Sequence, residues 1–319
     1  MTEKTILVTG GSGFIGTMIC KLLADAGHNV VNLDRVKKTI PNVTQYPFDI
    51  DNHQVKGLLK VIKPDTIIHL AADHEVGRSV LQPGVFYHNN VANSITLLNC
   101  AIETGVKNFI FSSSSSVYGD ILSFPTDELT PKAPLSPYGK TKSWIEDALP
   151  DYETAYGLKF VSLRYFNAAG ADPELTHGYT QEPASHLVPI LCKKALANET
   201  VVINGNDYDT PDGTAVRDYT HVFDIATAHL AAINYLDDGG KSTTFNIGAG
   251  EPKSILEVIK TFEELGINIP YEFGPKRAGD PAITFADITK AKQLLGWSPI
   301  YKISDIVQHA WAWETKRTK

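Results

Sequence analysis

The chain has 319 residues, of which 43% are hydrophobic and 20% charged, enough for one large α/β domain or two smaller ones. Its formal charge of −7, without a basic block, excludes nucleic acid as an expected partner, and no apolar run approaches the ~18 residues of a membrane span. Cys20, Cys100 and Cys192 form no CxxC pair, so we expect buried thiols in a reducing compartment and no metal site. Because the first strand begins close to the start of the chain, no signal peptide is expected, and the predicted location is the cytoplasm.

A glycine-rich turn near the start of the chain carries the first functional signal. The apolar run Ile6–Val8 predicts a buried strand, and the stretch that follows, TGGSGFIG, places glycines three residues apart before an apolar helical pattern. Such a turn lets the backbone approach a pyrophosphate, and the N-terminus of the following helix offers unpaired N–H groups and a positive dipole end. We therefore predict a dinucleotide site. Its expected contacts here are Gly10, Gly13, Phe14, Ile15 and Gly16.

The end of the second strand refines this prediction. The run Asn29–Leu33 predicts a strand, and Asp34 follows it, eighteen residues after Gly16. A carboxylate at this place accepts hydrogen bonds from the adenosine ribose and repels a 2′-phosphate, which favours NAD over NADP. Arg35 weakens that preference, because an arginine can accommodate the phosphate. We count both Asp34 and Arg35 as cofactor contacts.

Strands and helices keep alternating through the first half, which predicts a parallel, doubly wound sheet. A third strand ends near Asp49, a fourth covers 66–70, and a helical pattern covers 83–105. Small residues after the fourth strand let a cofactor lie close to the backbone, whereas His69, in the strand body, is expected to be a core histidine. The cofactor contacts expected on these segments are Asp49, Ile50, Leu70, Ala71, Ala72 and Asn89.

Five consecutive serines, 112–116, follow a fifth strand that begins at Asn108. A serine run is usually a flexible linker. This one directly follows a buried strand and precedes Val-Tyr-Gly, so it is expected at the carboxyl edge of the sheet, where ligands bind.

The next helix holds a second constellation. Ser136 and Pro137 predict its N-cap and first helical position. Tyr138 and Lys142, four residues apart, then share one helix face. An ammonium beside a phenol is expected to lower the phenol pKa from its usual value of ~10. The phenolate can take a proton from a sugar hydroxyl while a hydride moves from the carbon that bears this hydroxyl to a nicotinamide.

Strands and helices alternate less regularly in the second half of the chain. We predict a NAD-binding domain over 1–167, with a return segment near 219–240, and a smaller, mixed substrate-binding domain over 168–319. A helix is expected near 186–196. A turn-rich stretch that ends at Arg217 suits a loop whose arginine binds a phosphate bidentately.

Several longer motifs together resemble the extended short-chain dehydrogenase/reductase family, and within it the UDP-glucose 4-epimerase branch. The resemblance covers essentially the whole chain. Its more specific motifs are FSSS before Val-Tyr-Gly119, SPYGK ending at Lys140, RYFN ending at Asn167, and the stretch from GNDY, which ends at Tyr208, to VRDY, which ends at Tyr219. It implies a Rossmann-type NAD-binding fold with a smaller nucleotide-sugar domain, and a homodimer that keeps NAD bound through the catalytic cycle.

The resemblance also implies roles for single residues. Tyr138 would take the proton of the sugar 4-OH, Ser114 would polarise the C4 oxygen, and Lys142 would hold the nicotinamide ribose. The resulting 4-keto sugar would turn over and receive hydride on its other face. Further cofactor contacts would be His74, Ser112, Tyr138, Lys142 and Tyr165. The substrate contacts would be Ser114, Ser116, Tyr138, Asn167, His186, Leu187, Asn204, Arg217, Arg277, Asp280 and Thr284.

Three departures from the family pattern are visible. His74 stands where the family often has lysine, and the loop after the second strand is short. Thr284 occupies a place where some members have a bulky tyrosine. A smaller side chain leaves room beside the sugar, so we hypothesise that N-acetylated UDP-hexosamines are accepted as well as UDP-hexoses.

The same fold is also used by enzymes and binding proteins of other functions. Nucleotide-sugar dehydratases and decarboxylases tend to carry an acid at the fifth strand edge, where this chain has Ser115 and Ser116, so both are disfavoured. A 4-epimerase of a UDP-pentose or UDP-uronate remains open. A non-catalytic NAD-binding protein is disfavoured, because Ser114, Tyr138 and Lys142 are all present.

Overall fold

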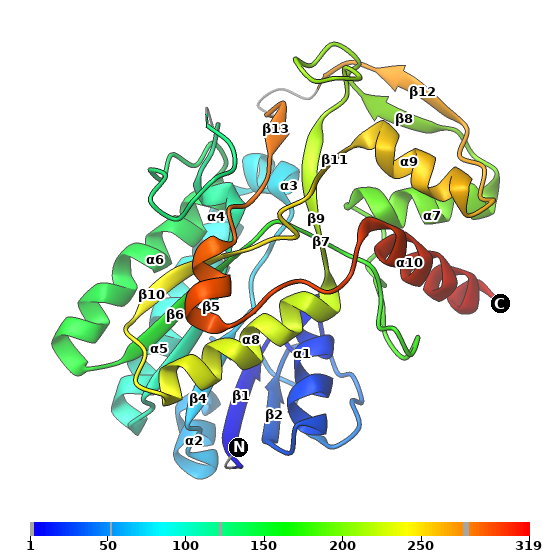
Figure 1. Cartoon of the computed structure of the whole chain (residues 1–319). Coiled ribbons are helices and arrows are strands. Elements are labelled where there is room, and N and C mark those ends of the chain that lie inside the picture. The colour runs from blue at the N-terminus through cyan, green and yellow to red at the C-terminus, as the bar shows by residue number, and fades with distance from the viewer. Residues whose placement is uncertain (1–2, 52, 121–122, 277–280) are drawn as a thin grey trace.

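A seven-stranded parallel sheet with helices on both faces forms the centre of the molecule (Figure 1). The computed structural model describes residues 3–51, 53–120, 123–276 and 281–319. The strand order is β10-β6-β5-β4-β1-β2-β3, so the chain winds outward in both directions from β1 and β4. This confirms the predicted doubly wound α/β class.

The first, second, fourth and fifth strands lie close to their predicted places. The strands of the described residues are β1 Thr5–Thr9, β2 Asn29–Leu33, β3 Val43–Tyr46, β4 Thr66–His69, β5 Asn108–Ser114, β6 Lys159–Tyr165, β7 Asn167–Ala169, β8 Val201–Asn204, β9 Val216–His221, β10 Thr243–Ile247, β11 Pro252–Ser254, β12 Tyr271–Gly274 and β13 Ile283–Thr284.

The helices alternate with these strands. The α-helices are α1 Phe14–Asp25, α2 Gln54–Ile62, α3 Val76–Leu81, α4 Pro83–Tyr87, α5 Asn93–Thr104, α6 Pro137–Tyr156, α7 Leu187–Ala197, α8 Val222–Asp237, α9 Ile255–Glu264 and α10 Ile303–Thr318. Two π-helical segments, η1 His88–Ala92 and η3 Ala291–Leu295, and the short 3₁₀ turn η2 Ser115–Val117 complete the set.

The central strands are buried on both faces, as continuous apolar runs in parallel sheets require. Ile6 and Val8 belong to one hydrophobic core, which α1 and α8 cover, whereas Leu7 belongs to a second core, covered by α2, α5 and α6. Successive residues of a strand point to opposite faces, so one short strand contributes to both cores. The sheet is therefore held from both sides, and its carboxyl edge is left for ligands.

A smaller part adjoins this edge. In it β9 pairs with β7, β11 and β13, and β8 pairs with β12. A third hydrophobic core joins these strands to α7, α9 and α10. The chain returns to the large sheet through α8, which packs against α1, and through β10, which pairs with β6. This return extends to residue 247, past the limit near 240 expected from the sequence.

Three local expectations need correction. The third strand ends at Tyr46, so Asp49 lies beyond it in the loop. Arg217 lies in β9 and not in a loop, because pairing with β11 and β13 imposes extended backbone on that stretch. The helical pattern over 83–105 is divided by the π-helical segment η1.

Candidate active site

The carboxyl ends of the central strands open into a cavity of about 700 Å³. It lies where the strand order reverses between β4 and β1, the position at which doubly wound sheets bind ligands. All of the cofactor contacts expected from the sequence lie in its lining. They are Gly10, Gly13, Phe14, Ile15, Gly16, Asp34, Arg35, Asp49, Ile50, Leu70, Ala71, Ala72, His74, Asn89, Ser112, Tyr138, Lys142 and Tyr165.

The glycine turn has the shape that a pyrophosphate needs. Gly10 has a φ of +75°, and a Cβ on it would come within 2.6 Å of the Ala71 nitrogen. A Cβ on Gly16 would lie 2.2 Å from the Gly10 oxygen. Gly13 caps α1 without a side-chain hydrogen bond, so the first N–H groups of that helix face the cavity unobstructed. The turn therefore fits a dinucleotide.

The adenosine side of the cavity is lined with carboxylates. Asp34 accepts hydrogen bonds from the backbone N–H of Ser12 at 2.9 Å and of Val36 at 2.8 Å, which fixes its orientation. The guanidinium of Arg35 lies 3.8 Å from Asp49 and 4.0 Å from Asp73. Because the arginine is already paired with two carboxylates, the site favours a ribose hydroxyl over a 2′-phosphate.

Tyr138 and Lys142 enter the cavity from the first turns of α6. The side chain of Ser136 caps this helix by accepting the N–H of Gly139 at 3.1 Å. The Tyr138 hydroxyl is hydrogen-bonded to Ser114, at the end of β5. The Lys142 ammonium donates to the Ser112 carbonyl at 2.8 Å and lies 6.0 Å from the centre of the tyrosine ring.

The structure contradicts the expected lowering of the Tyr138 pKa. Burial raises the pKa of Tyr138, and the hydrogen bond with Ser114 offsets only part of that rise. Burial also lowers the pKa of Lys142 to about 7, with the Glu146 carboxylate opposing the change. The lysine is thus partly neutral at pH 7 and directed at a carbonyl, so it offers the phenol little charge.

A buried ion pair holds α6 against the sheet. Glu146 accepts hydrogen bonds from Arg164 Nε at 2.9 Å and Nη2 at 2.6 Å, and from Ser113 Oγ at 2.6 Å. It lies one turn beyond Lys142, on the face that carries Tyr138. We did not identify Glu146 from the sequence, although its spacing of four residues from Lys142 could have revealed it.

The nicotinamide side of the cavity ends at Tyr165. Its hydroxyl is hydrogen-bonded to Ser112 Oγ at 2.8 Å and to His229 Nε2 at 2.5 Å. His229 belongs to α8, so the segment that returns to the sheet helps to fix this wall. His69 is a core residue as predicted, bonded to Thr9 Oγ1 and to Ser94 Oγ, both at 2.7 Å.

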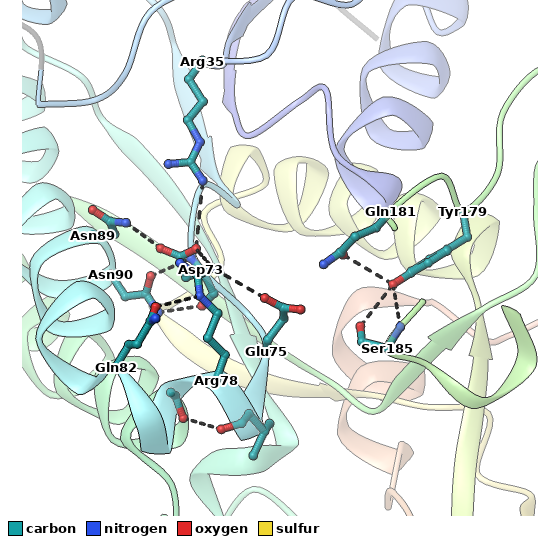
Figure 2. A network of polar contacts seen from close by, with 12 residues as sticks. Arg35, Asp73, Glu75, Arg78, Gln82, Asn89, Asn90, Tyr179, Gln181 and Ser185 are labelled. Carbon is teal, nitrogen blue, oxygen red and sulfur yellow. Dashed lines mark hydrogen bonds and ion pairs between the residues drawn. The ribbon is translucent and has the colours of Figure 1, made fainter. Parts of the chain in front are cut away.

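The substrate side of the cavity is closed by aromatic residues. The rings of His74 and His186 stack at 5.8 Å, and Tyr179 packs edge-on against His186 at 5.4 Å. Figure 2 shows the Tyr179 hydroxyl between Gln181 and Ser185, whose N–H it accepts at 3.2 Å. Burial lowers the pKa of His74 and lowers that of His186 to about 4, so both imidazoles are neutral at pH 7.

Only some expected substrate residues share this cavity. Ser114, Ser116, Tyr138, Asn167 and His186 line it. Other expected contacts are outside its lining: Leu187 in the first turn of α7, Asn204 at the end of β8, and Arg217 and Thr284, which lie opposite one another in β9 and β13. Arg277 and Asp280 lie outside the residues that the structure describes.

Asp73 and Asp218 are polar residues that sequence reasoning missed. Asp73, four residues after β4, could have been found by its place at a strand end. Asp218 is buried and accepts the N–H groups of Ala249, Gly250 and Ala286 at 2.6–3.1 Å. Burial raises its pKa to about 6, and these bonds oppose the rise. No local pattern marks such a residue, because its partners lie far away in the sequence.

The three cysteines are free thiols. Within the described ranges, no group of three or more metal-binding side chains gathers at one place. In that same part of the chain, no helix combines the length and apolarity needed to cross a membrane.

Comparison with known proteins supports the same reading of the site. Residues 6–248 match the family model described as the NAD dependent epimerase/dehydratase family. The chain belongs to this family. NAD, predicted from the glycine turn and Asp34, is therefore confirmed as the cofactor of the family to which it belongs.

Individual members of the family match over nearly the full length. A UDP-glucose 4-epimerase of Halalkalibacterium halodurans is 43% identical over 316 residues, covering 97% of this chain and 95% of the relative. The structure of a UDP-glucose 4-epimerase of Stenotrophomonas maltophila, with NAD and formylated UDP-arabinopyranose, is 34% identical with a TM-score of 0.95 and covers 99% of both chains. A UDP-Glc/GlcNAc 4-epimerase of Campylobacter jejuni is 35% identical with a TM-score of 0.85, covering 98% of this chain and 99% of that one.

Proposed function

We propose that the protein is an NAD-dependent UDP-sugar 4-epimerase that interconverts UDP-glucose and UDP-galactose. The observation that carries this proposal is the set Ser114, Tyr138 and Lys142, gathered in the dinucleotide cavity of a chain that resembles UDP-glucose 4-epimerases along its length. The dehydratase alternative would require an acidic side chain at position 115 or 116, and this chain has Ser115 and Ser116 there.

Tyr138 is the proposed acid and base. Its phenolate takes the proton of the sugar 4-OH, and its phenol returns a proton to the C4 oxygen after the sugar has turned over. Ser114, already bonded to Tyr138, donates a hydrogen bond to that oxygen and holds it near the phenol. Lys142, fixed on the Ser112 carbonyl, is positioned to hold a ribose hydroxyl.

The cofactor supplies what these side chains lack. NAD held in the cavity lined by Tyr138, Lys142 and Tyr165 would supply the hydride chemistry at C4 and a positively charged nicotinamide. Because an opposite charge stabilises phenolate, we infer that this positive charge would lower the pKa of Tyr138. The charge would thereby oppose the rise in the Tyr138 pKa that burial causes, in keeping with the role of base.

The N-terminus of α7 is the proposed diphosphate site. His186 occupies the N-cap without a side-chain capping bond, which leaves the first N–H groups of an eleven-residue helix available to an anion. Leu187, Asn167, Asn204, Arg217, Arg277, Asp280 and Thr284 remain proposed contacts of the UDP-sugar. We accordingly assign residues 1–167, with the return through α8 and β10, to NAD, and the rest of 168–319 to the nucleotide sugar.

Thr284 supports a wider substrate range. Its side chain is small and lies in a two-residue strand beside Arg217. We propose that UDP-N-acetylglucosamine is epimerised as well, in keeping with the Campylobacter jejuni relative, which is called a UDP-Glc/GlcNAc 4-epimerase. UDP-pentoses and UDP-uronates remain the alternative substrates.

A homodimer in the cytoplasm is the proposed assembly and location. Val80, Leu81, Val85 and Trp144, on the adjoining helices α3, α4 and α6, expose 62%, 82%, 39% and 53% of their surface. An apolar patch of this kind on a water-soluble fold is typical of a protein–protein interface. Sedimentation analysis tests the dimer, and charged substitutions at Leu81 and Trp144 should shift it to monomer.

The activity has a direct test. Purified protein is incubated with UDP-glucose and, separately, with UDP-N-acetylglucosamine, both without added cofactor, and products are resolved by chromatography. We expect the corresponding galacto-epimer in both tubes. Absence of UDP-galactose with and without added NAD would contradict the proposed function. UDP-galactose without UDP-N-acetylgalactosamine would contradict only the role given to Thr284.

A further inference from the structure

We propose that Arg35, Asp73 and Arg78 form a bridge across the mouth of the cofactor cleft that slows release of the dinucleotide. This inference rests on the proposed NAD-dependent function. Figure 2 shows the two arginines approaching the Asp73 carboxylate from opposite sides. We call these three residues the Asp73 bridge.

The order of the strands gives the bridge its position. Arg35 follows β2, and Asp73 follows β4, whereas β1 lies between these two strands in the sheet. A contact between the two residues therefore crosses the carboxyl end of β1, where the glycine turn begins. All three residues of the bridge line the cavity. A pyrophosphate bound at that turn would lie under the Arg35–Asp73 contact.

Asp73 is a fixed acceptor. It is 8% exposed, and Asn90 holds its backbone twice: the Asn90 Oδ1 accepts the Asp73 N–H at 2.8 Å, and the Asn90 Nδ2 donates to its carbonyl at 2.8 Å. The Asn89 amide donates to one carboxylate oxygen at 2.5 Å, and Arg78 donates to the other at 3.2 Å. Arg35 lies 4.0 Å from that second oxygen.

Arg35 is the movable member of the bridge. Its side chain is 63% exposed, and its other partner, Asp49, is 41% exposed. An ordinary exposed ion pair contributes little, because two long side chains lose entropy to form it and water screens it. Here one partner is already immobile, so only the arginine is ordered when the contact forms. Such an arrangement can open to admit a dinucleotide and close over it.

Charges of both signs lie along the bridge. The described residues of the lining include the guanidinium groups of Arg35 and Arg78 and the carboxylates of Asp34, Asp49, Asp73 and Glu75. Arg35 pairs with Asp49 and Asp73, and Arg78 pairs with Asp73 and Glu75. Because these pairs offset the positive charge, the bridge slows release by lying across the path of the dinucleotide and not by attracting its pyrophosphate.

The rate of NAD release tests the bridge without any sugar. Each variant is loaded with radiolabelled NAD and gel-filtered, and loss of label is followed in excess unlabelled NAD. The variants are R35Q, R35K, D73N and the double variant R35Q/D73N. K37Q is the matched control, because Lys37 is an exposed cation of the same loop outside the lining of the cavity.

We expect R35Q and D73N each to release NAD about three- to tenfold faster than the wild type, and K37Q to match the wild type. R35K, which keeps the charge, should fall between R35Q and the wild type. The double variant should release NAD no faster than the faster single variant, because both substitutions break the same contact, the one between Arg35 and Asp73. If D73N does not fold, R35Q and R35K still decide the question.

Equal release by R35Q and K37Q, or additive effects in the double variant, would overturn the bridge. Epimerase activity of the wild type is measured separately. If the wild type is active and R35Q releases NAD at the wild-type rate, only the bridge proposal is contradicted. If the wild type binds NAD but is inactive, and R35Q releases NAD faster, the proposed function is contradicted and the bridge proposal is supported.

Discussion

The edge of the large sheet and the smaller part of the molecule hold their polar residues in different ways. At the sheet edge, Ser112, Ser114 and Tyr165 lie at the ends of strands that are buried on both faces, so their places follow from the sheet itself. In the smaller part, Asp218 joins three segments by accepting N–H groups from residues 31 to 68 positions away. The first arrangement places its residues through the sheet itself, whereas the second depends on contacts between segments far apart in the sequence.

The largest expected effect comes from removing the proposed base at the sheet edge. Y138F should lower kcat on UDP-glucose by about 10³-fold, because proton transfer at the 4-OH loses its positioned partner. Bound NAD, measured by absorbance after denaturation, should stay near the wild-type level. Y156F, at the exposed end of the same helix, is the control. Retention of more than about a tenth of the wild-type kcat by Y138F would rule out the assigned role.

The second effect concerns the support behind that edge. E146Q should lower the free energy of unfolding by about 3 kcal/mol, since it leaves the buried Arg164 without its counter-charge. Denaturant unfolding measures the change. E103Q breaks the exposed pair with Lys56 and should cost under about 1 kcal/mol. Equal losses in both variants would show that α6 is not anchored by the buried pair.

The third effect tests the burial of a histidine in the sheet through the pH dependence of stability. Burial lowers the pKa of His69 to about 3, below its usual 6.5. Above pH 6.5 the imidazole is neutral in both states, so the folded state suffers no penalty. As the pH drops from 6.5 toward 3, the unfolded chain binds the proton first and the free energy of unfolding falls. Between pH 7 and pH 5 this residue alone should cost about 2 kcal/mol of unfolding free energy. H69Q should flatten the pH dependence of stability by that amount. An unchanged slope would mean that His69 is not titrated on unfolding.

The smallest effect addresses the smaller part of the molecule, which holds Thr284. T284Y should reduce kcat/KM for UDP-N-acetylglucosamine about tenfold more than for UDP-glucose, because a large ring fills the space proposed for the acetamido group. I283L, in the same strand, is the control. Equal losses on both substrates would remove Thr284 from the specificity of the enzyme and weaken the contrast between the two regions.

Much of the fold and of the cofactor site could be predicted from the sequence. Alternating apolar strands and helices specify a parallel sheet, and the edge of such a sheet collects strand ends, so Asp34 and the serine run 112–116 could be placed together. The place of Tyr165 came from the resemblance to the epimerase branch. The glycine turn and the cap of α6 were local signals as well. The lining of the cavity contains every cofactor contact that these signals suggested.

The remaining features depend on contacts that no local pattern encodes. Arg217 was expected in a loop, but its pairing with residues 36 and 67 positions away makes it part of a strand. The Tyr138 pKa was expected to fall, yet burial, a tertiary property, raises it. Asp73 acquires its importance from Arg35, across the end of β1.

The central claim is that hydride leaves C4 and returns to the same sugar. The most direct measurement uses UDP-glucose deuterated at C4, incubated with the purified protein in ordinary water without added cofactor, with the product examined by mass spectrometry and NMR. The account predicts UDP-galactose that retains deuterium at C4, because the label never leaves the active site. Loss of deuterium to solvent, with hydrogen at C4 of the product, would contradict it.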